Sequence, residues 1–493
     1  MIADQLPALQ VVVPLLAAPL CAMVRNRHVA WLIALTVSLA MPVISAALLA
    51  KVLAAGPISY WLGSWQPPWG IEYRIDATSA FLLLLVSGIA AVIMPYARAS
   101  LDREIPHQRQ PWYYALFLLC LAGLLGMTAT GDAFNVFVFL EISSISSYAL
   151  IALGRDRRAL MASYQYLVIG TVGATFFVIG VGFLYVMTGT LNIADLAERL
   201  PQAASQRPVL VGLAFIAVGL CLKLALFPLH YWLPNAYAYA PSVTTAFLAA
   251  TATKVAIYLL LRFFFTVFAK TFPFQEIVLP AVWLTLSAAA IVYASTAAIY
   301  QDNVKRLLAY SSVAQIGYIT LGIGIGTEAG LSAAIVHLFN HGVMKGALFL
   351  LVGGIAYYGG AVTMKRIAGQ GRHMPLTIAG IVVAGASMVG VPGTVGFVSK
   401  WYLVSAALER GWWWLAVFVV GTSVLALVYM GRILEAALFR PAEPGAEKHG
   451  EMPLSMLVPA LVLVAACIYF GLDTELTGDV AARAARGLLG KLP

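Results

Sequence analysis

Charged residues are scarce in this chain of 493 residues. Asp, Glu, Lys and Arg together make up 10% of the sequence, whereas soluble globular proteins carry about 25%. So few charges do not cover the surface of a soluble protein of 52.7 kDa, and the composition therefore excludes a water-soluble enzyme. Segments of about ten residues in which apolar and polar residues alternate are also lacking, which excludes an outer-membrane β-barrel.

Cysteine motifs and nucleotide-binding motifs are missing as well. The four cysteines, Cys21, Cys120, Cys221 and Cys467, lie far apart inside apolar runs, and the sequence holds no CxxC and no Cys/His cluster. An iron–sulfur or structural zinc site is therefore not expected. Since P-loop and nucleophile-elbow motifs are absent too, we expect no cofactor and no metal. The first ten residues lack a basic segment, so the first apolar run is interpreted as a membrane span and not as a signal peptide.

Apolar length is what the sequence has in abundance. Apolar residues make up 61% of the chain, and the mean hydropathy is +0.89. Runs near the roughly 20 residues that a helix needs to cross a bilayer recur from one end to the other, which predicts an all-α polytopic membrane protein. About fourteen spans are expected, at 8–24, 30–54, 77–96, 112–130, 132–153, 159–187, 208–237, 242–267, 276–300, 304–326, 330–358, 375–409, 413–438 and 453–471.

The basic residues orient these spans. Sixteen Lys and Arg fall in loops on one side, and ten fall on the opposite side or in the amphipathic tail that follows the last span. Cytoplasmic loops carry the excess of basic residues, so both termini are predicted to lie outside the bacterial cytoplasmic (inner) membrane. The net charge of +9 is explained by these loops, and no nucleic-acid partner is expected.

Five ionisable side chains fall inside predicted spans instead of loops. They are Glu141, Lys223, Lys254, Lys345 and Lys400. Each unpaired charge at the centre of a bilayer costs about 2.5–3.5 kcal/mol, which sums to roughly 12–17 kcal/mol. This sum is comparable with the stability of a whole domain, about 5–15 kcal/mol. The five groups must therefore be paired, hydrated or neutral, and must face the protein interior.

Two interpretations of these charges are open. In the first, Glu141 and one lysine form a static ion pair between helices, although four lysines cannot all be neutralised by one carboxylate. In the second, the charges form a proton relay, because desolvation favours the neutral form of a lysine and makes proton exchange near neutral pH accessible. Each charge in a row at one depth then biases its neighbour.

His337, His341 and Lys345 recur every four residues and therefore share one helix face. Imidazole both donates and accepts a proton, which suits a relay. The spacing also suits zinc, but no third ligand is evident. Two neutral, hydrogen-bonded interior histidines are the remaining alternative.

Prolines interrupt two of the long spans. Pro228 and Pro234 lie within 208–237, and Pro392 is followed by Gly393 within 375–409. Proline removes a backbone donor and clashes with the preceding turn, so the helices are expected to break at these positions. Paired broken helices in two matching halves mark transport sites. The similarity of SSISSYALIALG (143–154) to SSVAQIGYITLG (311–322) favours two such halves.

Several segments resemble the signatures of the antiporter-like proton-translocating membrane subunit family. They are GDAFNVFVFLEISSISSYAL, LKLALFPLHYWLPNAYAYAPS, NVKRLLAYSSVAQIGYI, HLFNHGVMKGALFL and GVPGTVGFVSK. The family comprises the large membrane subunits of Mrp-type multisubunit Na⁺/H⁺ antiporters, of respiratory complex I and of membrane-bound hydrogenases. The resemblance covers roughly 75–440 and implies fourteen helices with two inverted five-helix repeats, each containing a broken helix. The implied segments are 1–110 (three helices), 111–268 (first repeat), 269–440 (second repeat) and 441–493 (last helix and tail).

The resemblance also implies roles for single residues. Glu141 matches the glutamate of the family's fifth helix, Lys223 the lysine before the break in the seventh, and Lys254 the connecting lysine of the eighth. His337, His341 and Lys345 match an HxxxHxxxK helix, and Lys400 matches the charged residue of the broken twelfth helix. Tyr237 departs from the pattern, since many relatives carry a histidine there.

Within the family, YWLGSWQPPWGIEYRID and TGTLNIADLAERLP are most similar to the D branch of the Mrp antiporters. This favours a proton-conducting subunit, not itself an enzyme, that works with other subunits to exchange protons for Na⁺ or K⁺ across the lipid bilayer. The alternative is a proton-pumping membrane subunit of complex I or of a membrane-bound hydrogenase, driven by electron transfer in other chains. A transporter of organic solutes is weaker, because the sequence offers few hydrogen-bonding residues for such a pocket.

Overall fold

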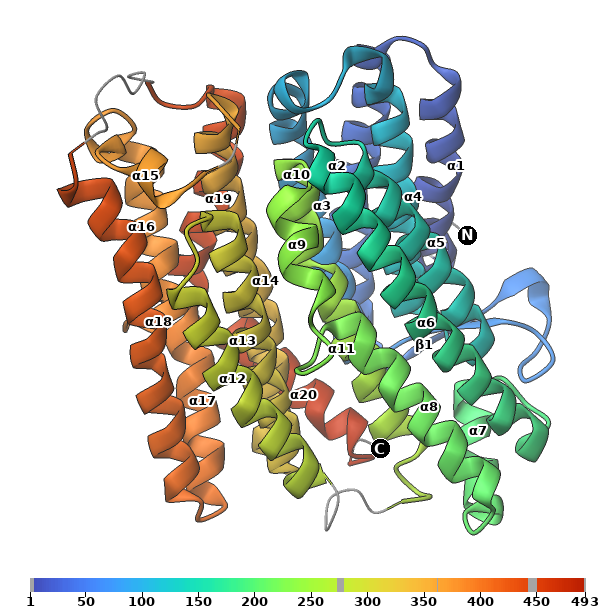
Figure 1. Ribbon diagram of the computed structural model, residues 1–493. Coiled ribbons are helices and arrows are strands. Elements are labelled where there is room, and N and C mark those ends of the chain that lie inside the picture. The colour runs from blue at the N-terminus through green and yellow to red at the C-terminus, as the bar shows by residue number, and fades with distance from the viewer. Residues whose placement is uncertain (1–3, 273–278, 361, 442–449, 492–493) are drawn as a thin grey trace.

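The computed structural model describes residues 4–272, 279–360, 362–441 and 450–491. Thirteen of its helices are long and apolar enough to cross a membrane, or up to fourteen if one bent pair is a single span. Figure 1 shows the long helices standing side by side as one bundle. The structure is therefore an all-α polytopic fold, as predicted.

The elements follow one another in a simple order. The chain begins with α1 (Leu6–Met23), α2 (Arg27–Ala55), β1 (Ile58–Trp61), β2 (Glu72–Ile75) and α3 (Ala77–Glu104). It continues with α4 (Gln110–Ala129), α5 (Ala133–Ala152), α6 (Arg157–Thr188), α7 (Ile193–Arg199), α8 (Arg207–Leu224), α9 (Trp232–Tyr239), α10 (Ser242–Ala250) and α11 (Ala252–Arg262). It ends with α12 (Leu284–Ile299), α13 (Val304–Ile325), α14 (Glu328–Tyr357), α15 (Met364–Ile367), α16 (Pro375–Val389), α17 (Val395–Glu409), α18 (Trp413–Phe439), α19 (Leu454–Leu472) and α20 (Glu475–Leu488).

Each predicted span corresponds to one of these helices or to a consecutive pair. Residues 276–278 of the ninth predicted span lie outside the described residues. Local sequence sets several helix starts: Asp76 caps α3 in a capping box with Ser79, and Thr327 caps α14 by accepting from the amide of Gly330. The antiparallel β1–β2 hairpin, with Ile58 opposite Ile75, was not predicted.

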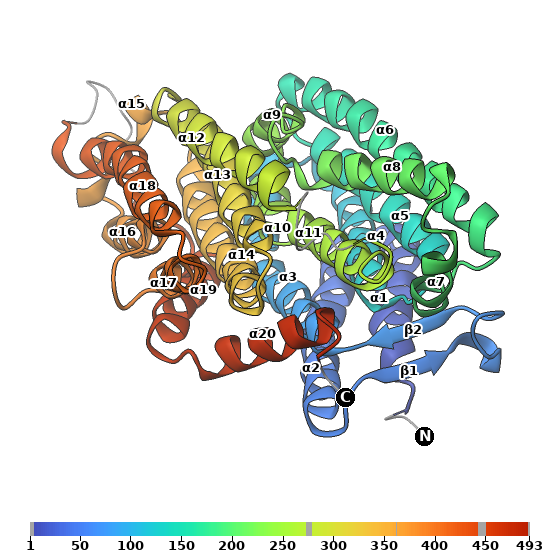
Figure 2. The ribbon, with the colours of Figure 1, turned by 90° about the horizontal axis from the view of Figure 1, so that it is seen from below.

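Helix α14 forms the centre of the bundle. Its most apolar stretch is completely buried, and the helix packs against α3, α10, α13, α16, α17, α19 and α20. Seen from below, α20 crosses the underside of the molecule (Figure 2), where it contacts α14 and α3. His337, Asn340, His341 and Lys345 of α14 are therefore fully enclosed by protein, as the cost of exposing a charge to lipid requires.

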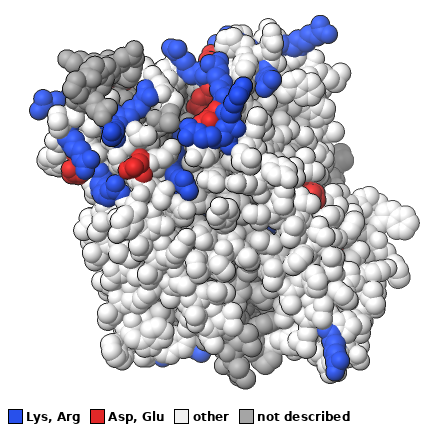
Figure 3. Space-filling model, in the orientation of Figure 1, with Lys and Arg blue, Asp and Glu red and all other residues white. Residues whose placement is uncertain are grey.

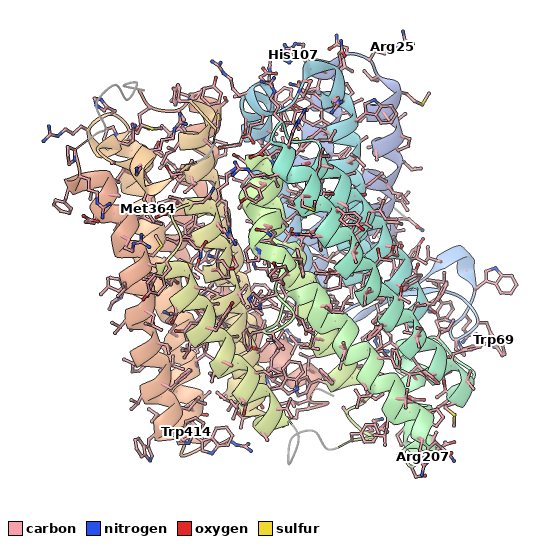
Figure 4. All side chains as sticks on the ribbon, viewed as in Figure 1. Arg25, Trp69, His107, Arg207, Met364 and Trp414 are labelled. Atoms are coloured by element: carbon pink, nitrogen blue, oxygen red, sulfur yellow. The ribbon has the colours of Figure 1, made fainter. Side chains whose placement is uncertain are left out.

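Charges gather at the ends of the bundle and not on its sides. Figure 3 shows Lys and Arg concentrated at the upper end of the molecule, while the flank below is almost free of charge. Figure 4 places Arg25 and His107 at this upper end, and Arg207 and Trp414 at the lower end. The alternation of loops between the two ends agrees with the predicted order of spans. Lys448, one of the sixteen basic residues counted in the loops of one side, lies outside the described residues. That the upper end is cytoplasmic stays a prediction.

The two proline-containing spans are broken, with one correction. Helix α8 ends at Leu224 and α9 begins at Trp232, so the first break contains Pro228, as predicted. Pro234 was predicted to break the helix but lies inside the first turn of α9, where a missing amide donor costs nothing, so this prediction is wrong. The second break separates Val389 from Val395 and contains Pro392 and Gly393.

Candidate functional site

Lys223 lies in the last turn of α8, directly before the first break. Ala225, two residues later, adopts a left-handed conformation with φ 59° and ends the helix. The Lys223 side chain is 7% exposed, and its Nζ donates to Ser144 Oγ at 2.6 Å and to the Tyr148 hydroxyl at 3.3 Å, both on α5. The amine at the end of α8 is thus hydrogen-bonded to two neutral hydroxyl oxygens on the neighbouring helix α5.

Glu141 lies on α5, one helical turn before Ser144. Its Oε1 is enclosed and has no hydrogen-bond partner within the described residues. The structure gives no direct ion pair between Glu141 and Lys223, since Lys223 Nζ contacts hydroxyls instead. The static ion pair that the sequence left open is therefore not the arrangement seen.

Lys254 lies next to a third helix break, which was not predicted from the sequence. Thr251, with φ −127° and ψ −55°, separates α10 from α11 without any proline. Lys254 is fully buried, and its Nζ donates to the carbonyl oxygen of Ala249 and to Thr253 Oγ1 at 3.3 Å. The break leaves the Ala249 carbonyl available, and Lys254 donates a hydrogen bond to it.

The three predicted residues of α14 are all fully buried. His337 is held at both ring nitrogens, 2.7 Å from Ser399 Oγ on α17 and 2.9 Å from Gln315 Oε1 on α13. Because both nitrogens are occupied, His337 is not placed to share a zinc ion with His341.

The other two members of this face differ from His337. The His341 ring lies parallel to that of His337, 6.3 Å between centroids, and neither of its nitrogens has a hydrogen-bond partner in the described part of the chain. Lys345 Nζ donates to the Leu308 carbonyl at 2.8 Å and to Ser311 Oγ, both on α13. The picture of two hydrogen-bonded interior histidines therefore fits His337 but not His341.

Lys400 follows the second break, in the first part of α17. It belongs to α17, yet its Nζ reaches back to the end of α16 and donates to the carbonyls of Met388 at 3.2 Å and Val389 at 2.8 Å. A third bond, 3.0 Å long, goes to Ser423 Oγ on α18. The last carbonyls of a helix carry partial negative charge, so this is a favourable place for a cation.

The four lysines share one pattern of contacts. Each Nζ is bonded to at least one side-chain hydroxyl, and for Lys254, Lys345 and Lys400 also to a backbone carbonyl. Within the described ranges, no carboxylate forms an ion pair with any of them. A hydroxyl accepts from an ammonium group and donates to a neutral amine, so these partners serve both protonation states.

Aromatic side chains connect Lys223 with Lys254. The Tyr148 ring contacts Tyr166 edge-on at 4.7 Å, and Tyr166 stacks on Trp232 at 3.8 Å. Trp232 contacts Tyr237, whose hydroxyl donates to the Leu248 carbonyl at 3.2 Å, next to the Ala249 carbonyl that holds Lys254. The two breaks are thus joined by a continuous packed chain.

Direct contacts link α14 to the helix that carries Lys400. His337 is bonded to Ser399, which precedes Lys400 on α17, and the ring of His341 lies parallel to that of His337. Lys345, on the same face of α14, is bonded to Leu308 and Ser311 of α13.

Lys305 and His230 are buried residues that the sequence analysis did not single out. Lys305 was one of the sixteen basic residues counted in loops, but it lies in the first turn of α13, is 8% exposed, and donates to Ser242 Oγ at 2.8 Å. The cue was Asn303, whose side chain caps α13 and so places Lys305 inside the helix. His230 lies in the first break, buried against the rings of Tyr293 and Tyr310. It stands in the quoted motif LFPLHYWLP, but nothing in the sequence separated it from an exposed loop residue.

Comparison with known proteins identifies relatives over the whole chain. Residues 130–426 match the family model described as NADH:quinone oxidoreductase/Mrp antiporter, TM. The N-type subunit of NADH-quinone oxidoreductase of Desulforudis audaxviator is 43% identical over 485 residues, which cover 95% of this chain and 96% of that protein. The D-type subunit of the Na(+)/H(+) antiporter of Bacillus subtilis is 29% identical over 482 residues, which cover 98% and 96%.

A solved structure shares the fold at full length. A chain in the Mrp complex from Dietzia sp. DQ12-45-1b superposes with a TM-score of 0.91 at 27% identity, covering 99% of this chain and 98% of that one. The breaks and buried lysines described above are therefore set in a fold that a multisubunit membrane complex also uses.

Proposed function

The chain belongs to the NADH:quinone oxidoreductase/Mrp antiporter transmembrane family, and from this premise we propose that it is the proton-conducting subunit of a multisubunit monovalent cation/proton antiporter. It is an integral membrane protein, and its bacterial relatives favour the cytoplasmic membrane. The excess of basic residues in the loops of one side supports a topology with both termini outside. The exchanged cation is Na⁺ or K⁺, and its movement depends on partner subunits.

The observation that carries the proposal is how the four lysines are held. A lysine locked in an ion pair keeps its proton, because a carboxylate stabilises the ammonium form. Lys223, Lys254, Lys345 and Lys400 instead contact neutral oxygens, so neither protonation state is locked. This arrangement suits groups that exchange protons and does not suit groups that only hold helices together.

Charge repulsion couples neighbouring sites of the relay. Like charges repel one another more strongly inside a protein than in water, because the effective dielectric constant is lower there. A proton that arrives at Lys223 therefore disfavours a second proton on its neighbours and favours release farther along. Glu141 stabilises the proton on Lys223, and His337 and His341 pass protons between Lys254 and Lys400.

A second function has one specific observation in its favour. The relative from Desulforudis audaxviator, at 43% identity, is named as a subunit of NADH-quinone oxidoreductase. In such a complex the same relay would be driven by electron transfer in other chains. The co-purifying polypeptides separate the two functions: subunits with iron–sulfur absorbance favour the redox complex, and small hydrophobic subunits without cofactors favour the antiporter.

The relay is tested by Lys223→Met and Glu141→Gln in the assembled complex. Both variants keep the side-chain volume and remove the titrating group, so we expect cation-induced proton movement in everted vesicles to fall at least tenfold. Lys365→Met, at an exposed position of α15, is the matched control and should leave transport unchanged. Blue-native electrophoresis checks that each complex assembles. Full transport by either relay variant in an assembled complex would refute the proposal.

A further inference from the structure

A charged cleft opens at the upper end of the molecule. Its volume is about 360 Å³, and it is lined by the ends of α3, α9 and α14, the loop between α5 and α6, and the start of α13. Its charged lining residues are Arg103, Glu104, Arg155, Asp156, Arg158 and Lys305. In Figure 3 basic side chains surround acidic ones at this end of the molecule.

Beneath the cleft, Ser242 joins a carboxylate to an amine. The backbone amide of Ser242 donates to Glu104 Oε2 at 2.6 Å, and Lys305 Nζ donates to the Ser242 hydroxyl at 2.8 Å. Lys305 Nζ also lies 3.5 Å from the Ala240 carbonyl. Lys305 therefore has the same partners as the buried relay lysines, a hydroxyl and a backbone carbonyl, but its opposite side borders the cleft.

Lys305 lies close to the relay along α13. Lys345 Nζ is bonded to the carbonyl of Leu308, which is three residues beyond Lys305 and therefore about 4.5 Å farther along the helix axis. On α10, Ala249 lies seven positions after Ser242, a rise of about 10 Å, and its carbonyl accepts a hydrogen bond from Lys254. The base of the cleft is thus one to two helical turns from two relay lysines.

We propose that this cleft is a proton mouth of the relay and that Lys305 is the residue that exchanges protons between water in the cleft and Lys345. The inference rests on the proposed function and adds a residue and an entrance to it. The neutral amine of Lys305 takes a proton from a water molecule in the cleft, and the hydroxide left behind diffuses out into solvent. The resulting ammonium group is stabilised by Glu104 through Ser242. The proton then passes to the neutral amine of Lys345, which restores Lys305 to its starting form.

The charge of the cleft suits protons and not metal cations. Asp156 is engaged by Arg158 through bonds of 3.1 and 2.8 Å, and Glu104 is engaged by Ser242 and Ser100. Arg103 and Arg155 leave the lining with an excess of positive charge. An incoming Na⁺ or K⁺ ion is repelled there, whereas a proton crosses by exchange between water and Lys305. The exchanged metal cation is therefore expected to use another route.

Water access is tested by cysteine labelling in the assembled complex, after the four native cysteines have been replaced by serine. Ala238→Cys lines the cleft, and Ala236→Cys, two residues earlier on the same helix, is fully buried and does not line it. We expect the small anionic thiol reagent sulfonatoethyl methanethiosulfonate to modify Ala238→Cys and not Ala236→Cys. An unmodified Ala238→Cys, or equal modification of both, would overturn the assignment of the mouth. This readout does not depend on antiport activity.

The role of Lys305 is tested by comparing Lys305→Met with Lys305→Arg. Arginine keeps the positive charge and the hydrogen bonds but does not release its proton. A relay residue therefore predicts that both variants lose transport at least tenfold while the cleft stays open to the thiol reagent. Transport restored by Lys305→Arg would show that only a fixed charge is needed and would overturn the inference. If the wild-type complex pumps protons without exchanging cations, the proposed function fails, and the same comparison is made on pumping.

Discussion

Removing the hydroxyl of Tyr237 tests how the break between α8 and α9 is coupled to the break between α10 and α11. Tyr237 is 1% exposed on α9, and its hydroxyl donates to the Leu248 carbonyl at the end of α10. Its own carbonyl accepts from Thr245 Oγ1 at 3.0 Å, so α9 and α10 are cross-linked at this residue. Phenylalanine keeps the ring contacts with Trp232 and Phe349 and deletes only the bond to Leu248.

The structure sets the size of the effect. A buried carbonyl that loses its partner costs about 1–3 kcal/mol, but Leu248 keeps a bond from the amide of Thr251. We therefore expect Tyr237→Phe to lower the free energy of unfolding by about 1 kcal/mol. The same carbonyl stands beside that of Ala249, which positions Lys254. If about 1.4 kcal/mol of this positioning is lost in the rate-limiting transfer, transport falls roughly tenfold.

Tyr96→Phe supplies the matched control. Tyr96 is equally buried, and its hydroxyl donates to a backbone carbonyl, that of Leu350, at 3.0 Å, on the side of α14 that faces α3. Both variants should lose similar stability in thermal unfolding of the detergent-solubilised complex. Only Tyr237→Phe should slow the initial rate of proton movement in vesicles and shift its pH profile. Equal transport by the two variants would refute the coupling through Tyr237.

Two further predictions concern the second break and an edge ion pair. A Cβ on Gly396 would lie 1.8 Å from the Ser387 carbonyl oxygen. Gly396→Ala should therefore force α16 and α17 apart, cost about 1–3 kcal/mol of stability and abolish transport through Lys400. The control Gly421→Ala, which has nothing within 4 Å of its Cβ, should change neither stability nor transport. Burial acts to raise the pKa of Asp76, but Arg262 at 2.7 Å and Ser79 outweigh it and lower this pKa to about 2. The ionised pair therefore contributes about 2–3 kcal/mol above pH 4, which is lost as the pH falls through about 2. Thermal unfolding at pH 7 should show this loss in Asp76→Asn and almost none in Glu435→Gln, whose pair with Arg440 is half exposed; equal melting temperatures for wild type and Asp76→Asn would contradict the estimate.

The sequence predicted the spans well because a bilayer leaves few choices. Apolar runs of fixed length must be helices, and the proline and glycine residues at 228, 392 and 393 mark where two of them break. Both breaks lie where these residues predicted them. The division into 1–110, 111–268, 269–440 and 441–493 stays a prediction.

Features that depend on tertiary contacts could not be predicted. The break at Thr251 contains no proline and is accompanied by the bonds of Lys254 and Tyr237 to the carbonyls of α10. Lys305 looked like a loop residue because it precedes an apolar run, and only the fold shows Ser242 above its amine. Pro234 failed as a helix breaker for a related reason, since the preceding chain had already turned at Pro228.

Arg262 and the relay lysines differ in their hydrogen-bond partners, and this difference distinguishes a stabilising role from a role in proton transport. The Arg262 side chain is 11% exposed and forms a direct ion pair with Asp76, which fixes its charge. Guanidinium does not give up its proton, so this pair is suited to holding α3 against α11. The relay lysines are amines, which lose their proton when desolvated, and the described chain gives them hydroxyls and carbonyls instead of carboxylates. The chain thus uses arginine with a carboxylate where a charge must stay, and lysine with a hydroxyl where, in the proposed mechanism, a proton must move.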